Sequence, residues 1–278
     1  MKISYSLYTL TPKRKANSQG SLSKKTGVNL RGEISGKTFY ADFFSHPELG
    51  DEPLDEFMED FKFQKSEFQK KIFDLLLKDH EFQNIQPQMF KNHALQTETT
   101  IHAPIKYKIM DEADYGYLPL LERRRTFRLD ANGMFSKDEF KKYISNLDPR
   151  LLKSVQYVED PTRELNWEDL PVSCARDFIN GTPADFIIYK PNARFKSNEA
   201  LPHIFSSYMG GALGVFHAYC ELIREGDLSL YHGINTFGVY EEDRELFTGQ
   251  DLLTPHVENI RRIYRDLSTS SWKHLGSI

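Results

Sequence analysis

The feature that most constrains the fold of this chain is a series of short β-rich runs between residues 105 and 207. The runs lie at 105–109, 126–129, 155–158, 172–175, 185–189 and 203–207. Each is followed by a polar or helical stretch, and connections of this kind favour parallel pairing, since antiparallel neighbours need only a tight turn. The series therefore predicts a parallel (β/α) barrel in which several units are unusually short.

The residues before the barrel predict a smaller α+β unit. Residues 1–10 largely alternate polar and apolar side chains, residues 28–44 have strand character, and residues 55–80 carry apolar side chains at helical spacing. Residues 12–27 are mostly polar and predict a mobile loop, with a lid as the sharper hypothesis. We expect this unit to span residues 1–88 and the barrel to span residues 89–235. Residues 236–278 are expected to form a C-terminal segment that returns to both. Further helices are expected at 210–225 and 255–267.

Composition excludes several classes of partner. The net charge of −4 and the pI near 6.2 give no general attraction to nucleic acid. No apolar run approaches the roughly 18 residues that a membrane-spanning helix needs. Cys174 and Cys220 lie in apolar segments without metal-ligand spacing, so we expect buried, reduced thiols and a cytoplasmic protein. The oligomeric state is left open, with a monomer as the simplest assembly.

Charged side chains recur where the predicted strands end. Lys108, Asp130, Glu159, Asp177 and Lys190 each follow or close a β-rich run. The carboxyl ends of barrel strands converge on one face, which is where barrel enzymes carry their chemistry. Three carboxylates without cysteine or histidine favour Mg²⁺ over zinc, with Mn²⁺ as the alternative ion.

Lysines beside such an ion have lowered pKa values suited to proton transfer. Lys106 and Lys108 are two residues apart on one strand, so they share a face. The residues predict proton abstraction next to the carboxylate of a small-molecule substrate, with a metal ion stabilising the enediolate.

A second interpretation makes residues 128–139 a calcium-binding loop of a non-catalytic protein. Asp130, Asn132, Gly133 and Glu139 then occupy the third, fifth, sixth and twelfth positions of an EF-hand. Arg128 stands at the opening position, where an aspartate normally binds the ion, and its permanent positive charge argues against this alternative.

Several motifs in order along the chain are shared with one group of enzymes. They are Lys106-Tyr-Lys108, Arg128-Leu-Asp130-Ala-Asn132-Gly133, Val158-Glu159-Asp-Pro161, residues 184–191 ending in Lys190-Pro191, residues 205–214, residues 232–236, and residues 41–57 near the start. At these motifs the chain resembles the enolase superfamily and, within it, the o-succinylbenzoate synthases. The resemblance implies an enolase-type (β/α) barrel with an N-terminal α+β capping domain, whose capping loop matches residues 19–25.

The resemblance also implies roles for individual residues. Lys108 matches the acid/base lysine, Lys106 its strand partner, and Lys190 the lysine that stabilises the intermediate. Asp130 and Glu159 match the first two magnesium ligands, and Asp177 is the candidate for the third. The implied substrate-binding set is Ser206, Ser207, Met209, Gly210, Gly211 and Asn132.

The reaction implied by the resemblance is the syn dehydration of 2-succinyl-6-hydroxy-2,4-cyclohexadiene-1-carboxylate to 2-succinylbenzoate, a step in menaquinone biosynthesis. An N-acylamino acid racemase or a muconate cycloisomerase of the same superfamily is the alternative.

The chain departs from the family pattern at three places. Phe178 and Ile179 replace the polar pair that usually follows the third ligand, Met110 stands where a glycine is common, and residues 84–104 are short for a helix and first strand. An incomplete barrel is therefore one expectation.

Overall fold

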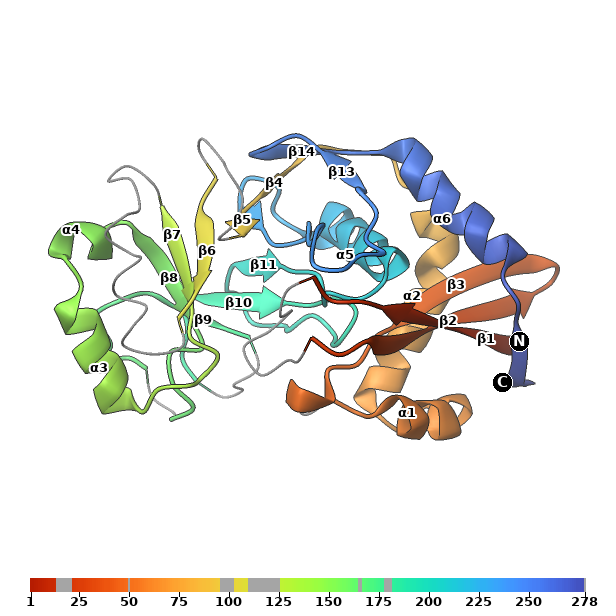
Figure 1. Ribbon diagram of the computed structural model, residues 1–278, viewed down its shortest axis with the longest axis horizontal. Helices are drawn as coiled ribbons and strands as arrows, with labels where there is room; N and C mark the ends of the chain where they lie inside the picture. The colour runs from red at the N-terminus through yellow and green to blue at the C-terminus, as the bar shows by residue number, and fades with distance from the viewer. Residues whose placement is uncertain are drawn as a thin grey trace.

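The computed structural model describes residues 1–13, 22–49, 51–95, 103–109, 126–164, 167–177 and 182–277. It contains a four-stranded antiparallel sheet and a seven-stranded parallel sheet, joined by helices (Figure 1). The two chain ends lie together beside the antiparallel sheet. Of the predicted lid loop, residues 14–21 lie outside the described residues, as do Met110 and residues 178–181.

The antiparallel sheet is built mainly from the N-terminal residues. Its order is β15 (Lys273–Ser277), β1 (Lys2–Leu10), β2 (Lys25–Ile34) and β3 (Lys37–Phe43). Ser35 and Gly36 connect β2 to β3 with φ values of 50° and 78°, as a two-residue hairpin turn requires. The loop prediction for 12–27 was wrong at its end, because residues 25–27 pair with β1 as part of β2.

The helical pattern over residues 55–80 corresponds to two helices rather than one. The 3₁₀ turn η1 (Pro47–Leu49) precedes α1 (Leu54–Asp60), which runs into η2 (Phe61–Phe63) before α2 (Glu67–Phe82) begins. The chain breaks at Gln64, whose φ is 49°, and Ser66 then caps α2 by accepting a hydrogen bond of 3.1 Å from the Gln69 amide. The buried stripe Ile72, Leu75 and Leu76 lies in the core shared with the sheet.

The parallel sheet confirms the predicted series of strands. Its strands run in chain order, and the six strands between residues 105 and 205 agree with their predicted runs to within two residues at either end, whereas the strand at residues 94–95 was not predicted. They are β5 (Ala94–Leu95), β6 (Ile105–Lys108), β7 (Phe127–Asp130), β8 (Val155–Glu159), β9 (Cys174–Arg176), β10 (Phe186–Tyr189) and β11 (His203–Phe205).

Two very short strands complete the ring. β12 (Tyr231–His232) pairs in parallel with β4 (Phe90–Asn92), which leads into β5 after one residue. On the other side of β12, the Gly233 amide donates to the Phe205 carbonyl at 2.7 Å. The His93 amide likewise donates to the His232 carbonyl at 2.7 Å. The barrel is therefore built from short units, as one expectation had it, and backbone hydrogen bonds through β12 and β4 connect the two edges of the curled seven-stranded sheet.

Few helices surround this ring within the described residues. α3 (Lys137–Asn146) and α4 (Pro149–Leu152) follow β7, and α5 (Ala212–Glu225) follows β11. α6 (Val257–Thr269) lies beyond β13 (Phe247–Thr248) and β14 (Leu252–Pro255), so the helices predicted at 210–225 and 255–267 are confirmed to within two residues. One buried core joins α5 to α2 and the antiparallel sheet, which holds the smaller unit against the barrel.

The prediction of buried thiols agrees with the fold. Cys174 and Cys220 are buried and unbridged. In the described part of the chain, no helix combines the length and apolarity that crossing a bilayer would take.

Candidate active site at the carboxyl ends of the barrel strands

Strand register brings the predicted charged residues together. Lys108 on β6 pairs with Asp130 on β7, which pairs with Glu159 on β8. Asp177 directly follows β9, and Lys190 directly follows β10. All five therefore lie at the carboxyl end of the ring, as the sequence predicted.

Lys106 lies one pleat deeper and connects the first two carboxylates. Its Nζ is 2.9 Å from Asp130 Oδ2 and 2.9 Å from Glu159 Oε2. Burial opposes the charge on Lys106, but the carboxylates of Asp130 and Glu159 outweigh it and raise the pKa of the ammonium well above its usual range. Lys106 is therefore a fixed positive charge beneath the site.

Lys108 has the opposite character. Burial lowers its pKa, and the positive charges of Lys106 and Lys190 lower it further, while Asp130 acts in the other direction. A lysine whose ammonium form is penalised in this way gives up its proton more readily than a surface lysine. Its neutral amine is a candidate general base.

The three carboxylates differ in their surroundings. Burial raises the pKa of Glu159 to about 7, and the nearby charges of Asp130 and Asp177 add to the effect. Asp177 is also buried, which raises its pKa, but Lys190 and Arg194 both form ion pairs with it and bring the pKa down to about 2. Asp177 is consequently ionised, while Glu159 is held close to its titration point.

The three carboxylates carry the type of ligand atom that a hard divalent cation binds. Three buried carboxylates at adjacent strand ends offer the oxygen donors that Mg²⁺ prefers, and the Lys106 ammonium already lies between two of them as a cation would. In this conformation, no three histidine, cysteine, aspartate or glutamate side chains of the described residues converge as a metal-binding group. The ion pairs of Asp177 with Lys190 and Arg194 direct that carboxylate elsewhere.

The calcium-loop interpretation of residues 128–139 is wrong. Residues 127–130 form strand β7 instead of a helix end. Glu139, the expected twelfth ligand, caps α3 by accepting hydrogen bonds from Ser136. Arg128 is fully buried inside the ring, where its Nε donates to Gln156 Oε1 at 2.8 Å.

The hydroxyl groups of the two serines in the predicted substrate-binding set differ in how strongly they are hydrogen-bonded within the protein. The Ser207 hydroxyl is buried and bonded to Thr236 Oγ1 at 3.2 Å, so it serves the packing of the loop. The Ser206 hydroxyl has only long contacts, of 3.3 Å to the Gly233 carbonyl and 3.4 Å to the Ser207 carbonyl. Ser206 is the hydroxyl that is free to turn towards a ligand.

The glycines of this set bring the barrel loop against the antiparallel sheet. A Cβ on Gly210 would lie 2.8 Å from Phe44 Cβ, and the Gly211 amide donates to the Tyr8 hydroxyl at 3.1 Å. Met209 adopts a φ of 51°, and Tyr240 donates to its carbonyl at 2.9 Å.

Asn132 completes the set. Its φ is 49°, it lies two residues beyond Asp130 at the end of β7, and its Nδ2 is buried without a hydrogen-bond partner among the described residues.

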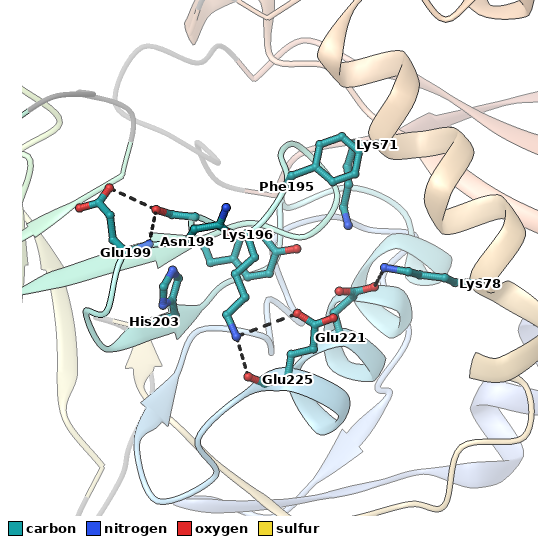
Figure 2. A pocket seen from close by; sticks show the side chains of 11 residues that line it. Lys71, Lys78, Phe195, Lys196, Asn198, Glu199, His203, Glu221 and Glu225 are labelled. Atoms are coloured by element: carbon teal, nitrogen blue, oxygen red, sulfur yellow. Dashed lines mark hydrogen bonds and ion pairs between the residues drawn. The ribbon is translucent and has the colours of Figure 1, made fainter.

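A cavity of about 520 Å³ lies elsewhere, on the outer wall of the barrel (Figure 2). It is bordered by α2, α5 and the connection from β10 to β11. Its charged side chains neutralise one another, as in the 3.2 Å contact between Lys78 Nζ and Glu221 Oε1. The strand-end residues do not line it, so it is separate from the candidate site.

Comparison with known proteins agrees with the sequence motifs. Residues 3–73 match the family described as "O-succinylbenzoate synthase, N-terminal domain". An o-succinylbenzoate synthase of Bdellovibrio bacteriovorus is 25% identical, over 87% of this chain and 88% of that protein. The chain is therefore similar to the o-succinylbenzoate synthases in its N-terminal residues and over most of its length.

Several solved structures share the fold of this chain. The o-succinylbenzoate synthase of Thermosynechococcus elongatus BP-1, solved with magnesium in its active site, aligns with a TM-score of 0.68 and 16% identity over 95% of this chain and 100% of that one. Muconate lactonizing enzyme from Pseudomonas putida aligns with a TM-score of 0.67 and 13% identity over 95% and 98%. The predicted enolase-type barrel with an N-terminal α+β unit is confirmed.

Two residues of the candidate site were not predicted from the sequence. Arg194 pairs with Asp177 from a turn beyond β10, and nothing in its local sequence distinguishes it from a surface arginine. His93 lies inside the ring beside Arg128, with Nδ1 3.0 Å from its Nη1. A buried histidine in the first strand was a weak signal, because the strand itself is too short to be recognised.

Proposed function

We propose that the protein is an o-succinylbenzoate synthase, a carbon-oxygen lyase that dehydrates 2-succinyl-6-hydroxy-2,4-cyclohexadiene-1-carboxylate to 2-succinylbenzoate. One observation carries the proposal. Lys108, whose pKa is lowered by burial, lies in register with the Asp130 and Glu159 carboxylates and within electrostatic range of Lys190. This arrangement combines a general base, a negative cluster for a cation and a second ammonium at one barrel end.

In the proposed reaction, Lys108 Nζ accepts the proton from the carbon next to the substrate carboxylate. The electron pair of that C–H bond moves towards the carboxylate, and the charge is stabilised in part by the Lys190 ammonium. Because the elimination is syn, the same lysine returns its proton to the leaving hydroxyl on that face, and water departs. Formation of an aromatic ring drives the step.

Asp130, Glu159 and Asp177 would hold the magnesium ion. When bound, the ion would supply positive charge that favours loss of the proton next to the substrate carboxylate. Asp177 joins the set only by exchanging its contacts with Lys190 and Arg194, and that exchange leaves the Lys190 ammonium available to the substrate. Lys106 Nζ contacts Asp130 and Glu159 from below and offsets their negative charges.

The decisive experiment supplies purified protein with magnesium and the cyclohexadiene substrate and measures 2-succinylbenzoate. N-succinyl and N-acetyl amino acids and cis,cis-muconate are assayed in parallel. Dehydration that is faster than any racemisation or cycloisomerisation supports the proposal. Clear racemisation without dehydration would assign the site to the related racemases instead.

A further inference from the structure

Tyr208 is an aromatic side chain at the candidate site to which the proposed reaction gives no role. It follows Ser206 and Ser207 in the loop after β11, and its ring lies beside the Lys190 ammonium. The distance from Lys190 Nζ to the ring centroid is 5.6 Å, which is within the range of a cation–π contact. Lys190 therefore has two neighbours of different kinds, the Asp177 carboxylate and the face of an aromatic ring.

Residues of the smaller α+β unit hold this ring in place. The Tyr208 hydroxyl donates to the Asp51 carboxylate, and the His46 ring packs edge-on against Tyr208 with centroids 5.2 Å apart. His46 Nε2 also donates to the Tyr208 carbonyl at 3.0 Å, and the Phe68 ring at the start of α2 lies with its centroid 6.1 Å away. The ring belongs to a barrel loop, but the contacts that fix it come from the smaller unit.

The protonation states of these residues keep both hydrogen bonds intact at neutral pH. Burial and the Asp51 carboxylate raise the pKa of Tyr208, so its hydroxyl remains a donor. Burial and the Lys25 ammonium lower the pKa of His46, so its ring is neutral. Lys25 Nζ lies 3.3 Å from His46 Nδ1, which leaves the ring proton on Nε2 for the Tyr208 carbonyl.

The Lys190 ammonium needs a second support because its carboxylate partner has another proposed function. Asp177 must exchange its contacts with Lys190 and Arg194 before it can bind an ion. A lysine released from an ion pair has a long flexible side chain, and its ammonium is drawn towards water. The face of an aromatic ring attracts an ammonium without neutralising it, so the charge stays available to the substrate.

We propose that Tyr208 is a positioning residue that holds the Lys190 ammonium over the carboxyl end of the barrel. The smaller unit fixes the ring in that place. The inference deepens the proposed function and rests on it, because Lys190 is the group that stabilises the charge of the intermediate. Tyr208 acts through Lys190 and not on the substrate, so its loss should change kcat more than KM.

Two substitutions separate the ring from the hydroxyl. Tyr208→Leu removes the ring face and should lower kcat by about 2- to 30-fold, the scale of one cation–π contact, with KM nearly unchanged. Tyr208→Phe keeps the ring and loses only the bond to Asp51, so its kcat should stay closer to that of the wild type. Equal losses of kcat in the two variants, or a rise in KM at wild-type kcat in Tyr208→Leu, would overturn the inference.

A double-mutant cycle tests whether Tyr208 acts through Lys190. Once Lys190 is replaced with Ala, Tyr208→Leu should cost nothing further in kcat, because no ammonium remains to be positioned. An equal loss in both backgrounds would assign Tyr208 a structural role only. Tyr231→Leu is the matched control, since the Tyr231 ring centroid also lies 5.6 Å from a lysine, Lys91, in a pair that takes no part in the candidate site. This control should leave kcat unchanged, and thermal unfolding checks that each variant is folded.

The contact itself can be observed without a substrate. In protein labelled with ¹³C-lysine, the ring current of Tyr208 should shift the Cε protons of Lys190 upfield, both with and without magnesium. Lys190→Ala assigns the signal. Tyr208→Phe should keep the shift, and Tyr208→Leu should abolish it. A wild-type Lys190 signal at the position of an exposed lysine would contradict the proposed contact.

The two proposals fail in distinguishable ways. A wild-type protein that does not dehydrate the cyclohexadiene substrate overturns the lyase assignment, while the Lys190 signal still decides whether Tyr208 holds the ammonium. Normal dehydration with wild-type kcat in Tyr208→Leu overturns the role of Tyr208 and leaves the lyase assignment intact.

Discussion

Lys106 Nζ lies 2.9 Å from Asp130 Oδ2 beneath the carboxyl end of the barrel. The same ammonium contacts both carboxylate oxygens of Glu159, at 3.0 and 2.9 Å. A buried lysine that serves two carboxylates neutralises their repulsion, which a divalent cation also does. The ion pairs of Lys106 with Asp130 and Glu159 therefore link the stability of the barrel to the proposed metal site.

Replacing Lys106 with Met removes this charge and leaves Asp130 and Glu159 buried together. We expect the metal-free variant to lose about 3 kcal/mol of stability, the scale for breaking a buried ion pair. Magnesium should restore part of that loss, so the rise in Tm on adding the ion should be larger than in the wild type. Thermal unfolding with EDTA and with magnesium measures both effects. An equal rise in the two proteins would contradict the link.

Lys108→Ala should lower kcat by at least about 10³-fold, because positioned proton transfer contributes about 10²- to 10⁴-fold. Lys190→Ala should lower kcat on a similar scale through loss of charge stabilisation. Lys196→Ala is the matched control, since Lys196 lies at the outer cavity and donates to the Glu225 carbonyl at 2.8 Å. Steady-state kinetics measure kcat for each variant, and circular dichroism checks that each variant is folded. Wild-type activity in Lys108→Ala would show that Lys108 is not the general base.

Glu159→Gln and Glu139→Gln separate the barrel site from the discarded calcium loop. Glu159→Gln should weaken magnesium binding by at least about 10-fold, because a carboxylate ligand is lost. Glu139→Gln should leave it unchanged, since Glu139 caps α3 through Ser136 and a glutamine can make the same cap. Titration with magnesium and calcium provides the comparison. Loss of ion binding in Glu139→Gln alone would revive the calcium loop.

The sequence predicted the parallel ring because charged residues close strands that are otherwise apolar, and register then places Lys108, Asp130 and Glu159 side by side. It did not predict the closing strands β4 and β12, whose two or three residues are too short to show a period. Asp177 was expected as a ligand, yet it forms ion pairs with Lys190 and Arg194. Arg194 follows a turn that no local sequence pattern marks.

The contact between the two units rests on tertiary packing that a sequence does not display. Tyr8 donates to Asp42 Oδ1 at 2.6 Å, and a Cβ on Gly214 would lie 2.4 Å from Asp42 Oδ2. The motif around residue 210 was recognised as a loop and a helix. Its glycines additionally let α5 approach β3, which joins the barrel to the antiparallel sheet.

Asp42 gives the stability of the protein a defined pH dependence. Burial raises its pKa to about 6, although the Tyr8 hydroxyl stabilises the carboxylate. Below about pH 4 the Asp42 carboxyl is protonated in both the folded and the unfolded protein. Between about pH 4 and 6 it is ionised in the unfolded chain but still protonated in the folded protein, so the free energy of unfolding falls as the pH rises. We expect a loss of about 3 kcal/mol over this window that Asp42→Asn lacks.

Urea denaturation of the wild type and of Asp42→Asn at pH 4 and pH 7 tests whether Asp42 lowers the free energy of unfolding as the pH rises. The stability of the variant relative to the wild type should rise with pH. Asp138→Asn, at an exposed position of α3, is the control. A stability difference that is constant or falls with pH would show that Asp42 is not destabilised by its burial.

The most direct test of the whole account is the conversion of 2-succinyl-6-hydroxy-2,4-cyclohexadiene-1-carboxylate by purified protein, followed by chromatographic detection of 2-succinylbenzoate. We expect product formation that requires magnesium, is abolished by EDTA and is lost in Lys108→Ala. No product from folded, magnesium-loaded wild-type protein, with racemisation of N-succinyl amino acids in the same preparation, would contradict it.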